Sequence, residues 1–153
     1  MAALDREAVA AVDSTGQAAD ILALSDHLLD ALWRVEAAAL QRAGTAGGLV
    51  VAGMGGSGVG GALARALLAP RLQRPLELVR SSGIPAYCGP DTLVLCSSYS
   101  GNTEETLDAY DAAGAAGAPR VVSTSGGELA ARARRDKVPV IPLPGGFQPR
   151  AAI

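Results

Sequence analysis

Apolar residues recur at helical spacing over the first part of the chain. Between residues 21 and 35, leucine, isoleucine, valine and tryptophan return every few positions, with acids and arginines among them. This spacing places the apolar side chains on one face of a helix. Gly16 predicts a break between a short first turn and a long helix, and Gly44, Gly47 and Gly48 predict the end of the helical segment.

From residue 49 onward the pattern changes to short, continuous apolar runs separated mostly by helical stretches. Five such runs cover residues 49–52, 76–79, 93–95, 119–123 and 138–141. Parallel strands covered by helices on both faces have this character, because neither side of them meets water. The sequence therefore predicts an α/β fold, a doubly wound, five-stranded parallel sheet in three layers flanked by helices. We expect a helical segment over residues 1–45 that packs on a domain formed by residues 46–153.

Composition narrows the class of protein. The chain has 153 residues, of which 49% are hydrophobic, and its formal net charge is −2. That length allows one domain with a real core. A nearly balanced charge gives no bulk attraction to nucleic acid or to an anionic membrane. We see no signal segment and no bilayer-spanning run, and Cys88 and Cys96 lack metal-like spacing, so we expect a cytoplasmic domain with reduced thiols.

The first candidate site is the glycine-rich turn Gly53-Met54-Gly55-Gly56-Ser57-Gly58, which joins the first run to a helix. Ligands of parallel sheets bind at the carboxyl ends of strands, where glycines let the backbone approach an oxyanion. The turn also satisfies the G-x-G-x-x-G pattern of dinucleotide-binding domains. Those domains place an acid at the end of the next strand, but Glu77 lies inside the second run, and Arg80 after it could meet a 2′-phosphate. An NADP site, a sugar-phosphate site and a turn without ligand all stay open.

The second candidate site is the stretch CSSYSGNTEE at residues 96–105, between the third run and a helix. Ser98, Ser100 and Thr103 each offer a hydroxyl that can donate to an anionic oxygen. Asn102, with Glu105 three residues later, predicts a capping box at the start of that helix. One cap needs one hydroxyl, so the surplus indicates a phosphate monoester held by hydroxyls and amides, without lysine or arginine.

Together, GMGGSG at 53–58 and SYSGNTEET at 98–106 resemble the sugar isomerase (SIS) domain, which is flavodoxin-like. SGGEL at 125–129 and PGGFQPR at 144–150 narrow the resemblance to the bifunctional phosphoglucose/phosphomannose isomerase family. The resemblance runs from the region 13–32 to the end of the chain. It implies isomerisation of glucose 6-phosphate or mannose 6-phosphate to fructose 6-phosphate through a cis-enediol, without a metal or another cofactor.

The resemblance also implies roles for particular residues. Ser57, Ser98, Ser100 and Thr103 would hold the substrate phosphate, and Gly56 would shape the first turn. Arg150 would lie near the enediolate, as the catalytic residue of this chain, because a guanidinium can offset the developing negative charge.

The chain departs from the family pattern in one large and one smaller respect. The family's glutamate base, its histidine and a lysine near the site belong to a second SIS domain, which is absent from the 153 residues. His27 matches none of them, and Ala62 stands where the family often has an aspartate. The tail at Ile153 is typical of a helix cut short, so we expect a truncated amino-terminal half that turns substrate over weakly or not at all.

This interpretation implies two kinds of partner, and two alternative functions stay open beside it. We expect the chain to bind a sugar phosphate and to pair either as a homodimer or with a complementary carboxyl-terminal SIS half. A SIS sensor that binds a sugar phosphate without converting it is the first alternative. An NADP-binding domain is the second, although it leaves the hydroxyl-rich turn unexplained.

Overall fold

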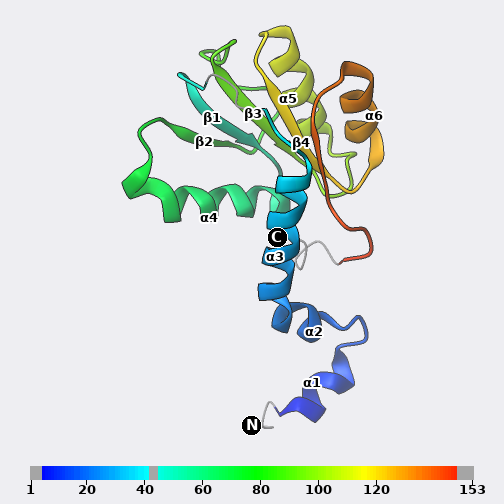
Figure 1. The fold of residues 1–153 in the computed structure, drawn as a ribbon. Helices are drawn as coiled ribbons and strands as arrows, with labels where there is room; N and C mark the ends of the chain where they lie inside the picture. The colour runs from blue at the N-terminus through cyan, green and yellow to red at the C-terminus, as the bar shows by residue number, and fades with distance from the viewer. Residues whose placement is uncertain (1–4, 42–44, 148–153) are drawn as a thin grey trace.

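The computed structural model describes residues 5–41 and 45–147, which form a parallel sheet between two layers of helices (Figure 1). The helices are α1 (Arg6–Val12), α2 (Gln17–Leu22), α3 (Leu24–Ala37), α4 (Val59–Leu68), α5 (Glu104–Ala115) and α6 (Gly127–Asp136). The strands are β1 (Gly48–Ala52), β2 (Leu76–Val79), β3 (Thr92–Ser97), β4 (Arg120–Thr124) and β5 (Val140–Pro142). Each of the predicted apolar runs forms a strand at nearly the predicted bounds.

The order of the strands determines where a ligand can bind. The sheet runs β2-β1-β3-β4-β5, and every pair of neighbours is parallel, which confirms the predicted fold class. The chain moves outward from β1 to β2 and then crosses back to β3. Such a reversal leaves a crevice at the carboxyl ends of β1 and β3, the two strands between which the direction changes. Ala52 pairs with Cys96, so the two candidate turns leave the sheet side by side.

The core lies on the face of the sheet that α5 and α6 cover. Side chains of β1, β3 and β4 on this face pack against the two helices, and the buried cluster includes Val50, Val94, Cys96, Tyr110, Ala113, Val122, Leu129 and Ala133. Burying one large aliphatic side chain of this kind stabilises the fold by about 1.5–3 kcal/mol. This layer is therefore the main source of stability.

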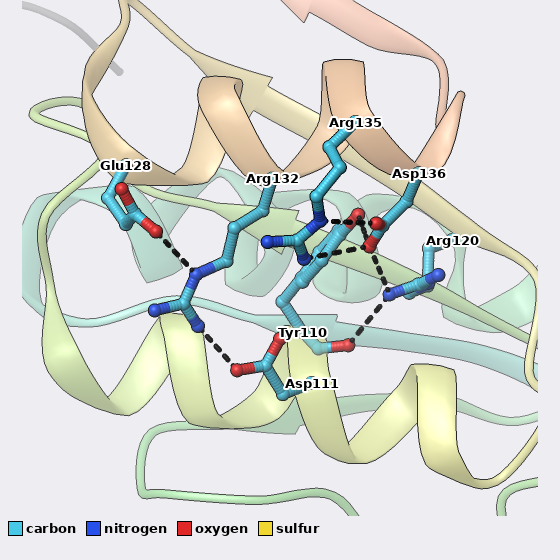
Figure 2. Close-up of polar contacts among 7 residues, drawn as sticks. All are labelled: Tyr110, Asp111, Arg120, Glu128, Arg132, Arg135 and Asp136. Atoms are coloured by element: carbon cyan, nitrogen blue, oxygen red, sulfur yellow. Dashed lines mark hydrogen bonds and ion pairs between the residues drawn. The ribbon is translucent and has the colours of Figure 1, made fainter.

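A charged network closes the same layer where α6 ends (Figure 2). The Tyr110 hydroxyl donates to Asp136 Oδ2 at 2.9 Å, and Arg135 Nε donates to Asp136 Oδ1 at 2.9 Å. The Arg120 guanidinium lies 4.3 Å from the centre of the Tyr110 ring. The hydrogen bonds from Arg135 and Tyr110 lower the pKa of Asp136, whereas burial and the bond to Asp136 raise the pKa of Tyr110 to about 12.

The opposite face of the sheet is covered by α3 and α4 and is packed less completely. Gly61 allows α4 to lie close to the sheet, because a Cβ there would be 2.9 Å from Val51 Cγ1. No residue of α1, α2, α3 or α4 is buried within the described part of the chain. Large apolar side chains stay exposed on these helices: Val12, Ile21, Leu22, Leu24, Leu28, Leu29, Leu32, Trp33, Val35, Leu63, Leu67 and Leu68.

The amino-terminal segment differs from the single long helix that its spacing predicts. Gly16, with φ of 73°, marks the predicted break, but a second break at Ala23 separates α2 from α3. No glycine or proline at Ala23 signals it. In Figure 1, α1 and α2 extend away from the sheet, whereas Arg34 of α3 donates to the carbonyl oxygen of Pro142 at 3.3 Å. The domain boundary at residue 45 stays a prediction.

None of the helices in residues 5–41 and 45–147 combines the length and the apolar character needed to cross a membrane.

Candidate functional site

The glycine-rich turn connects β1 to α4 through a single 3₁₀ turn, Gly55–Gly58. A Cβ at Gly58 would lie 2.6 Å from the carbonyl oxygen of Gly53, and a Cβ at Gly53 would lie 2.9 Å from that of Ser97. Both neighbours are backbone atoms that cannot move aside, so the tight turn requires glycine at these positions. Gly56 and Ser57 are half-buried in this 3₁₀ turn, which leads directly into the start of α4.

The hydroxyl-rich turn after β3 is held by its own side chains. Ser98 is 1% exposed, and its Oγ lies 3.0 Å from Thr103 Oγ1 and accepts from the Gly101 amide at 3.1 Å. Ser100 is exposed, and its Oγ accepts from the Asn102 amide at 3.3 Å. The predicted hydroxyls therefore gather in one compact turn at the start of α5.

The predicted capping box at the start of α5 is wrong. Thr103 is the N-cap residue of α5, and the Oδ1 atom of Asn102 instead accepts from the amide of Glu128, in the first turn of α6, at 2.9 Å. Gly101 has φ of 70° and packs directly against the carbonyl group of Gly126, without room for a Cβ. Because these two turns touch backbone to backbone, the side chain of Asn102 reaches the neighbouring helix.

The two candidate turns meet through Tyr99. The Tyr99 amide donates to Ser57 Oγ at 3.2 Å, and the Tyr99 carbonyl accepts from the amide and the hydroxyl of Ser125 at 3.1 and 2.6 Å. The segments that follow β1, β3 and β4 are thus tied together at one edge of the sheet. The glycine turn and the hydroxyl turn therefore lie together at this edge.

A cavity of about 310 Å³ opens beside Ser57, between α3 and the sheet. Gly56, Ser57 and Tyr99 line it together with Pro144 and Phe147, from the segment after β5. The rest of its wall comes mainly from apolar side chains of α3 and of the sheet. Its volume is at the lower end of the range of small-molecule sites, about 300–1,000 Å³. Among the predicted hydroxyl ligands of the phosphate, Ser57 lines this cavity. Ser98, Ser100 and Thr103 belong to the hydroxyl turn but not to the cavity wall.

A cation, Arg80, lies beside the glycine turn, and the phosphate site without lysine or arginine stays a prediction. The Nε atom of Arg80 is 3.3 Å from the position that a Cβ of Gly58 would occupy. Arg80 follows β2, whose last residue, Val79, pairs with Ala52 of β1. A guanidinium next to the start of α4 faces the positive end of a helix dipole, and a bound anion would offset that repulsion.

The acid expected for a dinucleotide site lies in the wrong place. Glu77 pairs with Val50, inside the sheet and away from the carboxyl ends of the strands. Its carboxylate accepts a hydrogen bond from the Tyr87 hydroxyl, which raises the pKa of Tyr87 to about 12. Glu77 is thus two residues short of the carboxyl end of β2, the position at which a dinucleotide-binding domain has its acid.

Arg150, the predicted catalytic residue, lies outside the described residues. The other predicted residues, Gly56, Ser57, Ser98, Ser100 and Thr103, belong to the two turns that Tyr99 joins. Sequence reasoning missed Tyr99 itself. An aromatic residue between two serines gives no signal for its role, because its partners come from other strand ends.

No protein-family model matches the chain. Among curated proteins, the chain is similar to bifunctional phosphoglucose/phosphomannose isomerases from Caldicellulosiruptor bescii and Aquifex aeolicus. The first is 47% identical over 105 residues, which are 69% of this chain and 31% of the relative. The second is 40% identical over 107 residues, which are 69% of this chain and 33% of the relative. The chain spans about a third of the length of the curated relatives it matches.

Solved structures share the fold. A protein described as a sugar-phosphate isomerase from Listeria monocytogenes gives a TM-score of 0.60 at 22% identity, covering 96% of this chain and 78% of that one. The sugar isomerase domain of the transcription factor RpiR from Sphaerobacter thermophilus gives 0.55 at 19% identity, covering 86% and 74%. These identities support the fold alone. Together with the sequence similarity, they show that the chain carries a SIS domain, and that this domain is similar to the matching third of the bifunctional phosphoglucose/phosphomannose isomerases.

Proposed function

We propose that the two turns bind the phosphate group of a sugar phosphate. The observation that carries this proposal is the hydrogen bond of 3.2 Å from the Tyr99 amide to Ser57 Oγ, which brings the glycine turn and the hydroxyl turn to one place. In this proposal Ser57, Ser98, Ser100 and Thr103 are the hydroxyl ligands, and Gly56 shapes the approach. A site that uses both turns explains why hydroxyls gather beyond the needs of helix capping.

The arrangement suits a phosphate dianion. The starts of α4 and α5 offer backbone N–H groups and favourable helix dipoles. In the contact of 3.0 Å between Ser98 Oγ and Thr103 Oγ1, one hydroxyl donates to the other, so the second proton is left for an outside acceptor. Arg80, beside Gly58, adds a positive charge from the end of β2. Hydroxyls and amides bind a phosphate without the strong hold of several cations, which permits release after each turnover.

We further propose that this SIS domain is the phosphate-binding half of an isomerase that interconverts glucose 6-phosphate or mannose 6-phosphate with fructose 6-phosphate. The names of the curated relatives support this reaction. Opening of the sugar ring would be followed by transfer of a proton between C1 and C2 through a cis-enediol, with Arg150 near the developing charge. The base would come from a second SIS domain. Since a general base contributes about 10²–10⁴-fold, the 153 residues alone would turn over weakly or not at all.

The partner in this proposal is a second SIS domain, in another copy of the chain or in a complementary carboxyl-terminal half. The exposed apolar side chains of α3 and α4 support it, because Leu29, Trp33 and Leu67 are each more than half exposed, at 67%, 63% and 78%.

A cytoplasmic location belongs to the same proposal, since Cys88 and Cys96 are both free thiols.

Thermal unfolding with added ligands tests the phosphate site. Fructose 6-phosphate at about 100 times its Kd should stabilise the fold by about 2.7 kcal/mol, or about 5–10 °C in Tm. Fructose without phosphate and NADP should leave the Tm unchanged. The double variant Ser100→Ala, Thr103→Ala should lose the shift, whereas the matched control Ser14→Ala, Thr15→Ala, in an exposed turn before α2, should keep it. A shift with NADP alone would support the dinucleotide alternative, and a shift that survives in the double variant would place the phosphate elsewhere.

A SIS sensor is the second candidate, because the fold matches the sugar isomerase domain of a transcription factor as well as isomerases. Isomerisation assays separate the two. The chain should gain activity when a carboxyl-terminal SIS half from one of the curated relatives is added. Binding of fructose 6-phosphate without turnover under that condition would favour the sensor.

A further inference from the structure

The side chain of Tyr99 links the two turns to a third segment at the same edge of the sheet. This segment, residues 143–147, follows β5. The Tyr99 hydroxyl donates to the carbonyl oxygen of Pro144 at 3.1 Å and accepts from the amide of Phe147 at 2.8 Å. One phenol oxygen therefore holds the segment at two points that are three residues apart.

The backbone and the side chain of Tyr99 have separate partners. Its amide and carbonyl groups bond to Ser57 and Ser125, in the segments after β1 and β4. Its hydroxyl bonds to the 143–147 segment. Removing the hydroxyl leaves the backbone contacts of the phosphate turns in place. The effect of Tyr99 on the 143–147 segment can therefore be tested separately from its effect on the two turns.

The composition of the 143–147 segment makes the tyrosine contact important. The Leu143 amide donates to the carbonyl group of Thr124 at 2.9 Å, but Pro144 has no N–H, and Gly145 and Gly146 have no side chain to anchor. Gly146 adopts φ of 91°, a conformation in which glycine is freer than other residues. A segment of this kind takes a fixed position when an outside group holds it.

The held segment forms one wall of the cavity beside the phosphate turns. Pro144 and Phe147 line the cavity together with Ser57 and Tyr99, and the Phe147 ring lies 5.0 Å from the ring of His27 in α3. A molecule with its phosphate at Ser57 would extend its remaining atoms along this wall. The position of the segment then affects a sugar phosphate but not a free phosphate ion.

We propose that Tyr99 is a positioning residue, which holds the 143–147 segment at the distance from the phosphate turns that fits the sugar portion of the ligand. This proposal rests on the proposed phosphate site and adds a determinant of specificity to it. The variant Tyr99→Phe tests it, because phenylalanine keeps the ring and the backbone bonds and removes two hydrogen bonds. Tyr87→Phe is the matched control, since the Tyr87 hydroxyl also donates to a partner, Glu77, but this partner is on the edge strand β2 and not in the 143–147 segment.

Two ligands and one exchange measurement give the readouts. By calorimetry, Tyr99→Phe should weaken binding of fructose 6-phosphate about tenfold and should leave binding of inorganic phosphate within about twofold of wild type. By hydrogen exchange without ligand, the Phe147 amide should lose protection in Tyr99→Phe. Tyr87→Phe should behave like wild type in all three measurements.

Each contrary result has its own meaning. Unchanged binding of fructose 6-phosphate in Tyr99→Phe would overturn the positioning role, and so would an equal loss for both ligands, because the tyrosine would then act on the phosphate turns themselves. An unchanged Phe147 amide would show that the hydroxyl does not hold the segment. A wild-type chain that binds neither ligand would overturn the proposed phosphate site and this proposal with it. This failure is seen in the wild type, so it is distinguished from a failure of the positioning role, which is seen only in Tyr99→Phe.

Discussion

The two faces of the sheet are built differently. On the face covered by α5 and α6, side chains such as Val122 and Leu129 are completely buried. On the face covered by α3 and α4, neither helix has a buried residue, and a cavity lies between α3 and the strands. The difference indicates that one face supplies most of the stability, while the other is left for a ligand and a partner domain.

Truncating one leucine on each face tests this division with the largest expected effect. Leu129 of α6 is 0% exposed, so Leu129→Ala should lower the free energy of unfolding by about 2–5 kcal/mol. Leu67 of α4 is 78% exposed, and Leu67→Ala should change it by less than about 0.5 kcal/mol. Urea unfolding measures both. Equal losses in the two variants would contradict the division.

Thiol reactivity compares two adjacent residues of β3 that point to opposite faces. Burial raises the pKa of Cys96 to about 12, so with Cys88→Ser as background, Cys96 should react with a disulfide reagent at pH 8 mainly after unfolding. A cysteine placed by Leu95→Cys, with Cys88→Ser and Cys96→Ser, should react at least about 100-fold faster, because local opening requires less free energy there. Similar rates would show that α3 covers its face as tightly as α5 and α6 cover theirs.

A smaller effect is expected where the two candidate turns join the packed face. Asn102→Ala should lower the free energy of unfolding by about 1 kcal/mol, because the cap on α6 is lost. In hydrogen exchange, the Glu128 amide, which donates to Asn102 Oδ1 at 2.9 Å, should lose protection. Loss of protection at Glu105 instead would restore the capping box at the start of α5 that the sequence predicts.

The smallest effect concerns the pH dependence of the charged network on the packed face. Arg135 and Tyr110 lower the pKa of Asp136 below its ordinary value of 3.8, so Asp136 contributes stability that is present above about pH 4 and is lost as the pH falls through its lowered pKa. Asp136→Asn should therefore be less stable than wild type at pH 7, and the difference should narrow below pH 4. A difference that is constant from pH 7 to pH 2 would contradict the assignment.

The sheet could be predicted from the sequence because its signals are local. The apolar runs are continuous, and the glycines of the turns are required by close backbone contacts such as that between Gly58 and Gly53. The order of the strands then places the turns after β1 and β3 together, as in other doubly wound sheets. Strands and turns whose signals lie within a few neighbouring residues can therefore be predicted from the sequence.

The sequence is least informative where a residue contacts a segment that is distant along the chain. Asn102 has the spacing of a cap for the helix that follows it, but its amide side chain caps α6. In the sequence, Arg80 is simply an arginine that follows an edge strand, and only the fold shows that its guanidinium lies beside Gly58. The break at Ala23 has no local signal of any kind. Contacts between strand ends decide the cases of Asn102 and Arg80, and residue spacing along the chain does not reveal such contacts.

The central claim is that the glycine turn and the hydroxyl turn bind one phosphate group. Amide chemical shifts of the ¹⁵N-labelled chain, recorded during titration with fructose 6-phosphate, test it most directly. Residues 56–58 and 100–104 should shift together and saturate at the same ligand concentration. Shifts that are confined to one turn, or that saturate at different concentrations in the two turns, would contradict the claim.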